Sequence, residues 1–482
     1  MKAPLYDKLI EYSKNTSSFH MPGHKFGKIL NMKEIPLLDL DATEVPGLDN
    51  LYDSKDIILE AENKMAVKYG ARDSIFLTNG STSGIIASIL SICNPGDSLI
   101  VSRNAHHSVW NALILGGIKP IYINPSHNDE YNIVGGICPL ELEKIIKNNP
   151  EVKGLIIVSP TYEGLVSDIE AISSVTTKYN KILIVDEAHG AHFVWNESFP
   201  RSAVEMGADL VIQSMHKTLP AITQSALLHI ATDRINKDGL INSLQMVQTS
   251  SPSYIMMGLM DYIRYELDKE KRIWDNYLVQ LTMTRNKLSK LEKLKLLKEG
   301  ICGSSNIFNI DISKIVIFTD NTNITGVELG GILKDKYDIQ VEIEADHYII
   351  AMSTISDSKK DLERLTDALF EIDRNLKEKT PEKYEYGNNI IRNNETTKDI
   401  FTPREIYFGG QEEVRIDDSI GRISAGNIIV FPPGIPLICI GEKFTKETVQ
   451  YIRMFPNKII GVNKKDNEIK VFVSKEGDKN EG

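Results

Sequence analysis

Short apolar runs alternate with helix-like stretches from about residue 60 to residue 235, and this alternation limits the possible folds most strongly. The runs are rich in Ile, Val and Leu, and they lie at 74–78, 98–102, 119–123, 154–159, 181–186 and 208–214. Helical patterns such as 140–149 and 168–179 separate them. Almost continuously apolar strands joined through helices are typical of a parallel sheet covered on both faces. In such sheets ligands bind at the carboxyl ends of the strands.

The chain divides further into an α/β large domain and smaller units. Long helical patterns occupy 252–299, and a smaller α+β pattern follows, which includes a helix near 325–337 and a charged helix at 358–379. A polar stretch with few aliphatic residues predicts a linker. We expect an N-terminal arm (1–58), a large domain (59–298), a small α+β domain (299–380), the linker (381–398) and a compact C-terminal domain (399–482).

Charge and composition narrow the classes of partner. The 482 residues carry a net charge of -11 without a basic tract. This argues against nucleic acid or an anionic membrane as a partner and suits a cationic ligand. The first 15 residues lack the apolar core of a signal peptide. No run of about 18 apolar residues predicts a membrane span. The four cysteines are scattered without metal-type spacing, so we expect reduced thiols in a cytoplasmic protein.

Polar residues follow the first two apolar runs. The run at 74–78 leads into "TNGSTSG", where Ser81, Thr82 and Ser83 precede an apolar helical pattern. Hydroxyls and free N–H groups at a helix N-terminus form an anion site, although a simple N-cap explains the same residues equally well. The run at 98–102 leads into "RNAHHS", so His106 lies on the side of the sheet where a ligand would bind.

An acid ends the fifth run, in "KILIVDEAHGAHF". Asp186 directly follows four apolar residues, so we expect it to be buried. A buried carboxylate is costly without a partner, and a protonated ring nitrogen would be such a partner. A metal site formed by Asp186, His189 and His192 is the alternative. We favour it less, because no matching cluster of ligands follows the other runs.

A lysine follows the sixth run, in "QSMHKTLP". An amine removed from water at a strand end has a lowered pKa and can act as a nucleophile toward an aldehyde. Lys217 thus completes a set that contains an anion cradle, a ring-facing histidine and the acid Asp186. Together these predict a site for pyridoxal 5'-phosphate (PLP).

Several motifs resemble the group III (Orn/Lys/Arg) PLP-dependent basic amino acid decarboxylases, which are enzymes of aminotransferase fold type I. The resemblance covers nearly the whole chain. The motifs are "FHMPGHKFG" (19–27), "DATEVPGLDNLY" (41–52), "NGSTSG" (79–84), "RNAHHS" (103–108), "DEAHGAHF" (186–193), "SMHKTL" (214–219), "TSSPSY" (249–254) and "GRISAGNIIVFPPGIPLICIGE" (421–442).

The resemblance implies roles for the matching residues. Lys217 would hold PLP as an imine, Asp186 would pair with the pyridine nitrogen, and His106 would stack on the ring. His189 would lie near the phenolic oxygen. The phosphate would be held by Ser81, Thr82, Ser83, Ser214 and His216. His107 stands where a lysine is common in the family, which leaves the stacking role of His106 intact.

The family also implies a reaction and an assembly. No N-terminal wing precedes the "FHMPGHK" motif, so the chain resembles the short, biosynthetic members, which are dimers or assemblies of dimers. These are most often associated with arginine, which gives agmatine and carbon dioxide; lysine and ornithine rank second and third. Candidate acids for the cationic end of the substrate are Glu44, Asp49 and Glu413.

Two functions of other classes stay open. An aminotransferase shares the fold and the aspartate–lysine pair, but it usually has a small-domain arginine for the substrate carboxylate. In 300–380 arginine occurs only within the charged helix, as at Arg364. A non-catalytic regulatory homologue is the other reading, and the intact Lys217, Asp186 and His106 argue against it.

Overall fold

The structure is a computed structural model that describes residues 3–380, 401–430, 435–456, 459–463 and 467–473. The expected linker (381–398) and the Pro-Pro-Gly part of the C-terminal motif lie outside the described residues. Among the described helices, none combines the length and apolar character that a membrane crossing requires.

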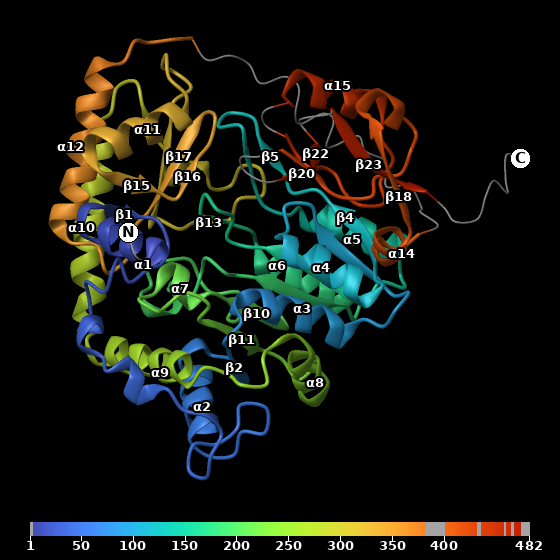
Figure 1. The fold of residues 1–482 in the computed structure, drawn as a ribbon, viewed down its shortest axis with the longest axis horizontal. Helices are drawn as coiled ribbons and strands as arrows, with labels where there is room; N and C mark the ends of the chain where they lie inside the picture. The colour runs from blue at the N-terminus through green and yellow to red at the C-terminus, as the bar shows by residue number, and fades with distance from the viewer. Residues whose placement is uncertain (1–2, 381–400, 431–434, 457–458, 464–466, 474–482) are drawn as a thin grey trace, which may run out of the picture.

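A mostly parallel sheet forms the centre of the molecule (Figure 1). In the described part of the chain it has seven strands in the order β2-β11-β10-β9-β7-β3-β4. Only β11 is antiparallel to its neighbours. The strands are β2 (Asp73–Leu77), β3 (Ser98–Ser102), β4 (Lys119–Ile123), β7 (Gly154–Val158), β9 (Ile182–Asp186), β10 (Leu210–Gln213) and β11 (Ala226–Ile230). The predicted α/β class with a mostly parallel sheet is confirmed.

Alternation along each strand builds two cores, one on each face of the sheet. Along β9, Leu183 and Val185 pack into the core that holds Ile172, whereas Ile184 packs into the core that holds Ile89. The first core includes side chains of α2 (Ile57–Tyr69), α5 (Pro139–Asn148), α6 (Ile169–Lys178) and α9 (Tyr254–Lys269). The second includes side chains of α3 (Gly80–Ile92), α4 (His107–Gly116) and α8 (Lys237–Val247). Helices on both faces explain why the strands are apolar throughout.

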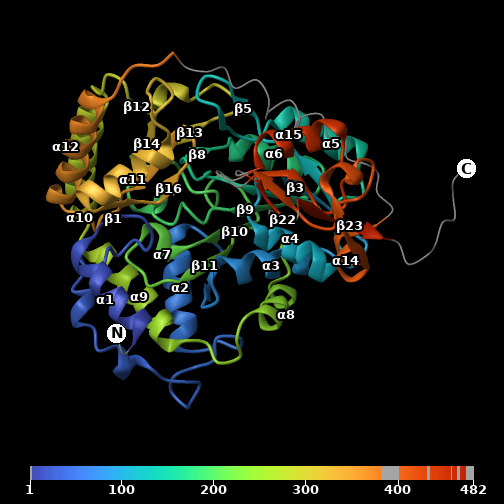
Figure 2. The same ribbon diagram turned by 45° about the horizontal axis from the view of Figure 1, so that its top comes forward.

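A smaller α+β unit lies beside the large sheet. Its antiparallel sheet has the order β12-β14-β17-β16, and α10 packs against α12 (Figures 1 and 2). The strands are β12 (Lys295–Leu296), β14 (Lys314–Phe318), β16 (Ile343–Glu344) and β17 (Tyr348–Met352). The helices are α10 (Arg272–Leu288), α11 (Gly326–Tyr337) and α12 (Lys359–Asn375). Both α10 and β12 precede residue 299, where the sequence places the start of this unit.

The N-terminal arm connects this small unit to the large sheet. After α1 (Pro4–Asn15), β1 (Ser17–Phe19) pairs in parallel with β15 (Ile339–Val341). Gly23 then approaches α7 (Met215–Thr218), and its N–H donates to the carbonyl of His216 at 2.8 Å. A Cβ at Gly23 would lie 2.4 Å from the carbonyl oxygen of Leu219, so only glycine fits this approach.

The C-terminal unit, residues 401–473 where described, packs over β3 and α4 (Figure 2). Its elements are α14 (Pro403–Phe408), β18 (Gly410–Arg415), β19 (Ile428–Val430), β20 (Ile435–Ile438), α15 (Lys446–Met454), β21 (Ile459–Ile460), β22 (Val462–Asn463) and β23 (Glu468–Val473). Arg103 and Glu442 join the units through a buried ion pair, with Nη1 2.8 Å from Oε1. Two short two-stranded sheets lie elsewhere in the chain. One pairs β5 (His127–Asn128) with β6 (Ile133–Val134), and the other pairs β8 (Leu165–Val166) with β13 (Asn309–Ile310).

Candidate active site

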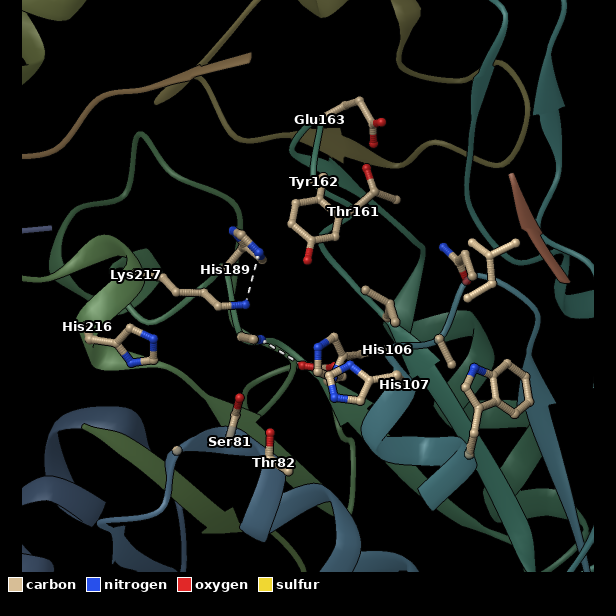
Figure 3. A pocket seen from close by; sticks show the side chains of 18 of the residues that line it. Ser81, Thr82, His106, His107, Thr161, Tyr162, Glu163, His189, His216 and Lys217 are labelled. Atoms are coloured by element: carbon tan, nitrogen blue, oxygen red, sulfur yellow. Dashed lines mark hydrogen bonds between the residues drawn. The ribbon is translucent and has the colours of Figure 1, made fainter. Parts of the chain in front are cut away.

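A cavity of about 530 Å³ opens at the carboxyl ends of the parallel strands. The segments that follow β2, β3, β7, β9 and β10 all contribute to its lining (Figure 3). Ile429 of β19 and Ile460 of β21 line it as well, so the C-terminal unit forms part of the wall. The position agrees with the rule for ligand sites in open α/β sheets.

Lys217 projects into this cavity from the short helix α7, directly after β10. Its Nζ lies 3.2 Å from Nε2 of His189 (Figure 3). Burial lowers the pKa of Lys217, and the nearby charges of Asp186 and Glu342 oppose that shift. An amine with a lowered pKa has its lone pair available for attack on a carbonyl group.

Asp186 is the last residue of β9 and is 3% exposed. Its Oδ1 accepts a hydrogen bond from the N–H of Ala188 at 3.1 Å. Burial raises the pKa of Asp186, while the charge of Lys217 and this hydrogen bond lower it. Within the described residues no basic side chain lies within 4.0 Å of the carboxylate. The carboxylate is thus available to a cationic group of a ligand.

The N-terminus of α3 forms the opposite end of the cavity. Gly80 has φ +70°, and the hydroxyl-bearing Ser81 and Thr82 line the space (Figure 3). The side chain of its N-cap residue, Asn79, makes no capping hydrogen bond within the described chain. Ser83 is buried behind them and donates to the carbonyl of Gly80 at 2.8 Å. The hydroxyl of Ser214 is buried without a hydrogen-bond partner among the described residues, and it does not line the cavity. The uncapped terminus suits an anion such as a phosphate.

Four histidines line the cavity: His106, His107, His189 and His216 (Figure 3). His106 caps α4, and its ring lies 4.0 Å from that of His107, centroid to centroid. Burial, assisted by the charges of His107 and Lys217, lowers the pKa of His106 to about 4. A neutral imidazole at this place can pack against an aromatic ring. His216 also lines the cavity, and its Nδ1 lies 3.0 Å from the carbonyl oxygen of Ser225.

The three acids proposed for the substrate end do not line the cavity. Burial alone would raise the pKa of Asp49, but backbone N–H groups of its own loop, among them those of Asp56 and Asn50, lower it to about 2. The carboxylate therefore organises the arm. Glu44 is exposed and accepts from Thr43, and Glu413 is exposed on β18. None of the three thus meets the cavity within the described chain, and their role toward the substrate stays a prediction.

A different acid lines the cavity. Glu163 follows β7 and accepts a hydrogen bond from the hydroxyl of Tyr348 at 2.7 Å. Its neighbours Thr161 and Tyr162 line the cavity too, and the ring of Tyr162 lies 4.8 Å from that of His189 (Figure 3). Sequence reasoning passed over these residues, although the polar segment "SPTYEG" directly after an apolar run was the available signal.

The residues considered for a metal site and for an arginine that binds the substrate carboxylate include His192 and Arg364, and both bond to other groups of the protein. Nε2 of His192 lies 3.2 Å from Asp311, so this histidine is already paired. Across the described residues no group of three His, Cys, Asp or Glu side chains is placed to hold a metal ion. Arg364 lies on α12 and donates to Ser17 and to the carbonyl of Tyr337, outside the cavity.

The fold is the one that PLP-dependent enzymes of fold type I share. The structure of the constitutive lysine decarboxylase from Escherichia coli superposes with a TM-score of 0.76 at 20% identity, and the match covers 98% of this chain and 82% of that chain. At this identity the likeness establishes the fold.

The chain belongs to the Orn/Lys/Arg decarboxylase family. The major domain of Orn/Lys/Arg decarboxylases matches residues 3–314, and their C-terminal domain matches residues 395–461. An arginine decarboxylase from Bacillus subtilis is 30% identical over 458 residues, which cover 94% of this chain and 93% of that protein. The uncharacterized protein YaaO from the same organism is 34% identical over 466 residues, 93% of each chain. The protein is therefore an amino acid decarboxylase of this family.

Proposed function

We propose that this enzyme uses PLP to decarboxylate L-arginine to agmatine. The observation that carries the proposal is the convergence of Lys217 and Asp186 on one cavity from neighbouring strands. A nucleophilic amine and a buried acid without a cation are the two groups that an aldehyde on a protonated pyridine ring requires.

The residues around the cavity fit PLP on structural grounds. The uncapped N-terminus of α3, with Ser81 and Thr82, matches a phosphate. Asp186 lacks a basic neighbour within the described chain and matches a ring N–H. When bound, PLP supplies the electron sink for the electron pair that remains after carbon dioxide departs.

The protein's own groups then have separate tasks. Lys217 would supply the amine that holds the aldehyde, and it would later supply a proton to the substrate's α-carbon. Asp186 would keep the proton on the ring nitrogen, since a carboxylate beside it favours the cationic form. His106 would pack on the ring face, and His189 would lie near the phenolic oxygen. Ser81, Thr82 and His216 line the cavity and would hold the phosphate. Ser83 and Ser214 are buried beside it and do not line it.

Arginine is the first substrate in this proposal because the Bacillus subtilis relative of nearly equal length is named arginine decarboxylase. Lysine, giving cadaverine, and ornithine are the alternatives. Among the described residues, Glu163 is the acid besides Asp186 that lines the cavity. We propose it for the cationic end of the substrate, in place of Glu44, Asp49 and Glu413.

The assembly and compartment are also proposals. Large apolar side chains of the N-terminal arm are exposed, including Leu38 at 86% and Leu5 at 74%. Exposed apolar side chains of this size suit burial against a second copy, so we propose a homodimer. The four cysteines are free, which is compatible with a reducing cytoplasm.

Separate incubations with arginine, lysine and ornithine test the substrate. Protein supplemented with PLP should release carbon dioxide and agmatine from arginine at a higher kcat/KM than it releases amines from the other two. A higher kcat/KM for lysine or ornithine would show that arginine is not the main substrate and that the enzyme is a lysine or ornithine decarboxylase. Equal inactivity on all three, with PLP bound, would favour a regulatory role.

A further inference from the structure

A second buried lysine lies directly behind the candidate active site. Lys314 is the first residue of β14 and is 1% exposed. Its Nζ lies 3.4 Å from Nδ1 of His189, whose Nε2 lies 3.2 Å from Nζ of Lys217. The three side chains thus form a row, lysine–histidine–lysine, from the small α+β unit into the cavity.

The surroundings of Lys314 do not explain its burial. Within the described residues no carboxylate lies within 4.0 Å of its Nζ, and His189 is its hydrogen-bond partner. Lys25, which is equally buried, instead donates to two carbonyl oxygens at 2.9 and 3.0 Å. A buried amine without a carboxylate is costly, so its retention points to a task.

The direction of the row depends on which lysine is protonated, and a protonated Lys314 sets it as follows. A protonated lysine can only donate, so Nδ1 of His189 must accept from Lys314. The proton of the neutral imidazole is then on Nε2 and points at Lys217. Lys217 must accept it through a lone pair, and an amine with a free lone pair is the nucleophilic form.

We propose that Lys314 is a positioning residue that fixes the Nε2–H tautomer of His189 and thereby keeps Lys217 as a neutral amine before the aldehyde arrives. This inference rests on the proposed function, because it assigns a task within aldehyde capture. The capture itself joins the amine to the aldehyde carbon and releases water.

Burial and nearby charges act on all three members of the row. Burial lowers the pKa of Lys314 to about 8, with Asp311 and Glu342 raising it and Lys217 and Lys25 lowering it. Burial holds the pKa of His189 well below its ordinary value, and the basic side chains of Lys217, Lys314, His216 and His106 lower it further. Asp186 opposes the loss of the proton from Lys217. Near neutral pH Lys314 is therefore the protonated donor and His189 the neutral link.

The rate of aldehyde capture across pH 6 to 10 tests the proposal. Apoprotein is mixed with PLP, and the absorbance change that depends on Lys217 is followed. In Lys314→Met the midpoint should rise by about one pH unit, which slows capture roughly tenfold at neutral pH. Lys314→Gln keeps a donor toward Nδ1 and should recover at least half of the shift. Lys25→Met, a buried lysine without contact to His189, should leave the midpoint unchanged.

Two outcomes would contradict the account, and they are distinguishable. A midpoint in Lys314→Met equal to that of the wild type, or an equal shift in Lys25→Met, would overturn the role of Lys314. Wild-type protein that captures no PLP at any pH would instead contradict the proposed function.

The tautomer of His189 gives a readout that does not depend on a folded variant of Lys314. Nitrogen-15 shifts of histidine-labelled apoprotein, assigned through His189→Gln, should show a protonated Nε2 and an unprotonated Nδ1. A proton on Nδ1 would overturn the proposal.

Discussion

At the scale of single residues, the groups proposed for catalysis are ionisable side chains that lie in the protein without a close partner of opposite charge among the described residues. Asp186 is buried and Lys217 is half-buried, and burial shifts the pKa of each toward its neutral form. Such shifts are typical of groups that act on a ligand. The solvated acids of the arm and of β18 lack this property, because water and local N–H groups already satisfy them.

Glu163→Gln tests recognition of the cationic side chain. A hydrogen bond to a charged group contributes about 1.5 to 3 kcal/mol, so KM for arginine should rise roughly 10- to 100-fold with a smaller change in kcat. Steady-state kinetics measure this. Glu413→Gln, an exposed acid outside the cavity, is the control and should match the wild type. A raised KM in Glu413→Gln together with an unchanged KM in Glu163→Gln would contradict the proposal and would assign binding of the cationic side chain to Glu413.

At the scale of elements, close packing of α3 on the sheet positions the proposed phosphate site at the N-terminus of this helix. Gly84 lies on the sheet-facing side of α3, where a Cβ would be 2.5 Å from Leu77 and 3.2 Å from Ile212. Interiors packed to this density do not accept an added methyl group without movement. The close approach sets where Ser81 and Thr82 stand in the cavity.

Gly84→Ala should lower the free energy of unfolding by about 1 to 3 kcal/mol through overpacking. Gly258→Ala is the matched control, since it also lies within a helix, α9, but has no atom within 4 Å of the added Cβ. That change should raise stability by about 0.5 to 1 kcal/mol through helix propensity. Urea unfolding of both variants measures the two effects, and equal effects would contradict the packing argument.

A buried acid on α2 makes stability depend on pH. Glu62 is 6% exposed, and burial raises its pKa from an ordinary 4.5 to about 8. Between these values the folded protein holds a proton that the unfolded chain has released, so stability falls as pH rises from about 5 to 8. Glu62→Gln removes this penalty, which is about 4 to 5 kcal/mol at most.

The difference in unfolding free energy between Glu62→Gln and the wild type, measured at pH 5 and pH 8.5, isolates this group. The variant should gain on the wild type as pH rises. A difference independent of pH would show that the carboxyl group titrates normally in the folded protein.

At the scale of the whole molecule, the C-terminal unit completes the cavity. Ile429 and Ile460 line it, and the buried pair of Arg103 and Glu442 ties their unit to the segment that carries His106. The same guanidinium donates to the carbonyl oxygens of Pro436 and Leu437, so one side chain connects β3 with β20.

Arg103→Met should destabilise the protein by about 3 to 5 kcal/mol, because it leaves Glu442 buried and unpaired. The double variant Arg103→Met/Glu442→Gln should recover part of the loss, since neither partner then carries a charge. Chemical unfolding of both proteins measures the coupling. A single variant as stable as the wild type would contradict a joining role for this pair.

The sequence predicted the parts of this architecture that depend on local pattern. Alternating apolar runs and helices gave the sheet, and polar residues after the runs at β9 and β10 gave Asp186 and Lys217. It could not provide the partners of a side chain, which depend on contacts between distant segments. Asp49 binds its own loop, Glu163 meets Tyr348, and Lys314 approaches His189 from 125 residues away in the chain.

Borohydride reduction of the protein incubated with PLP, followed by peptide mass analysis, tests the central claim most directly. Reduction makes the bond between an amine and the cofactor permanent, so the modified lysine can be located. The added mass should appear on the peptide that contains Lys217, and Lys217→Ala should carry none at that position. Modification of Lys314 or Lys25 in its place, or of no buried lysine, would contradict the account.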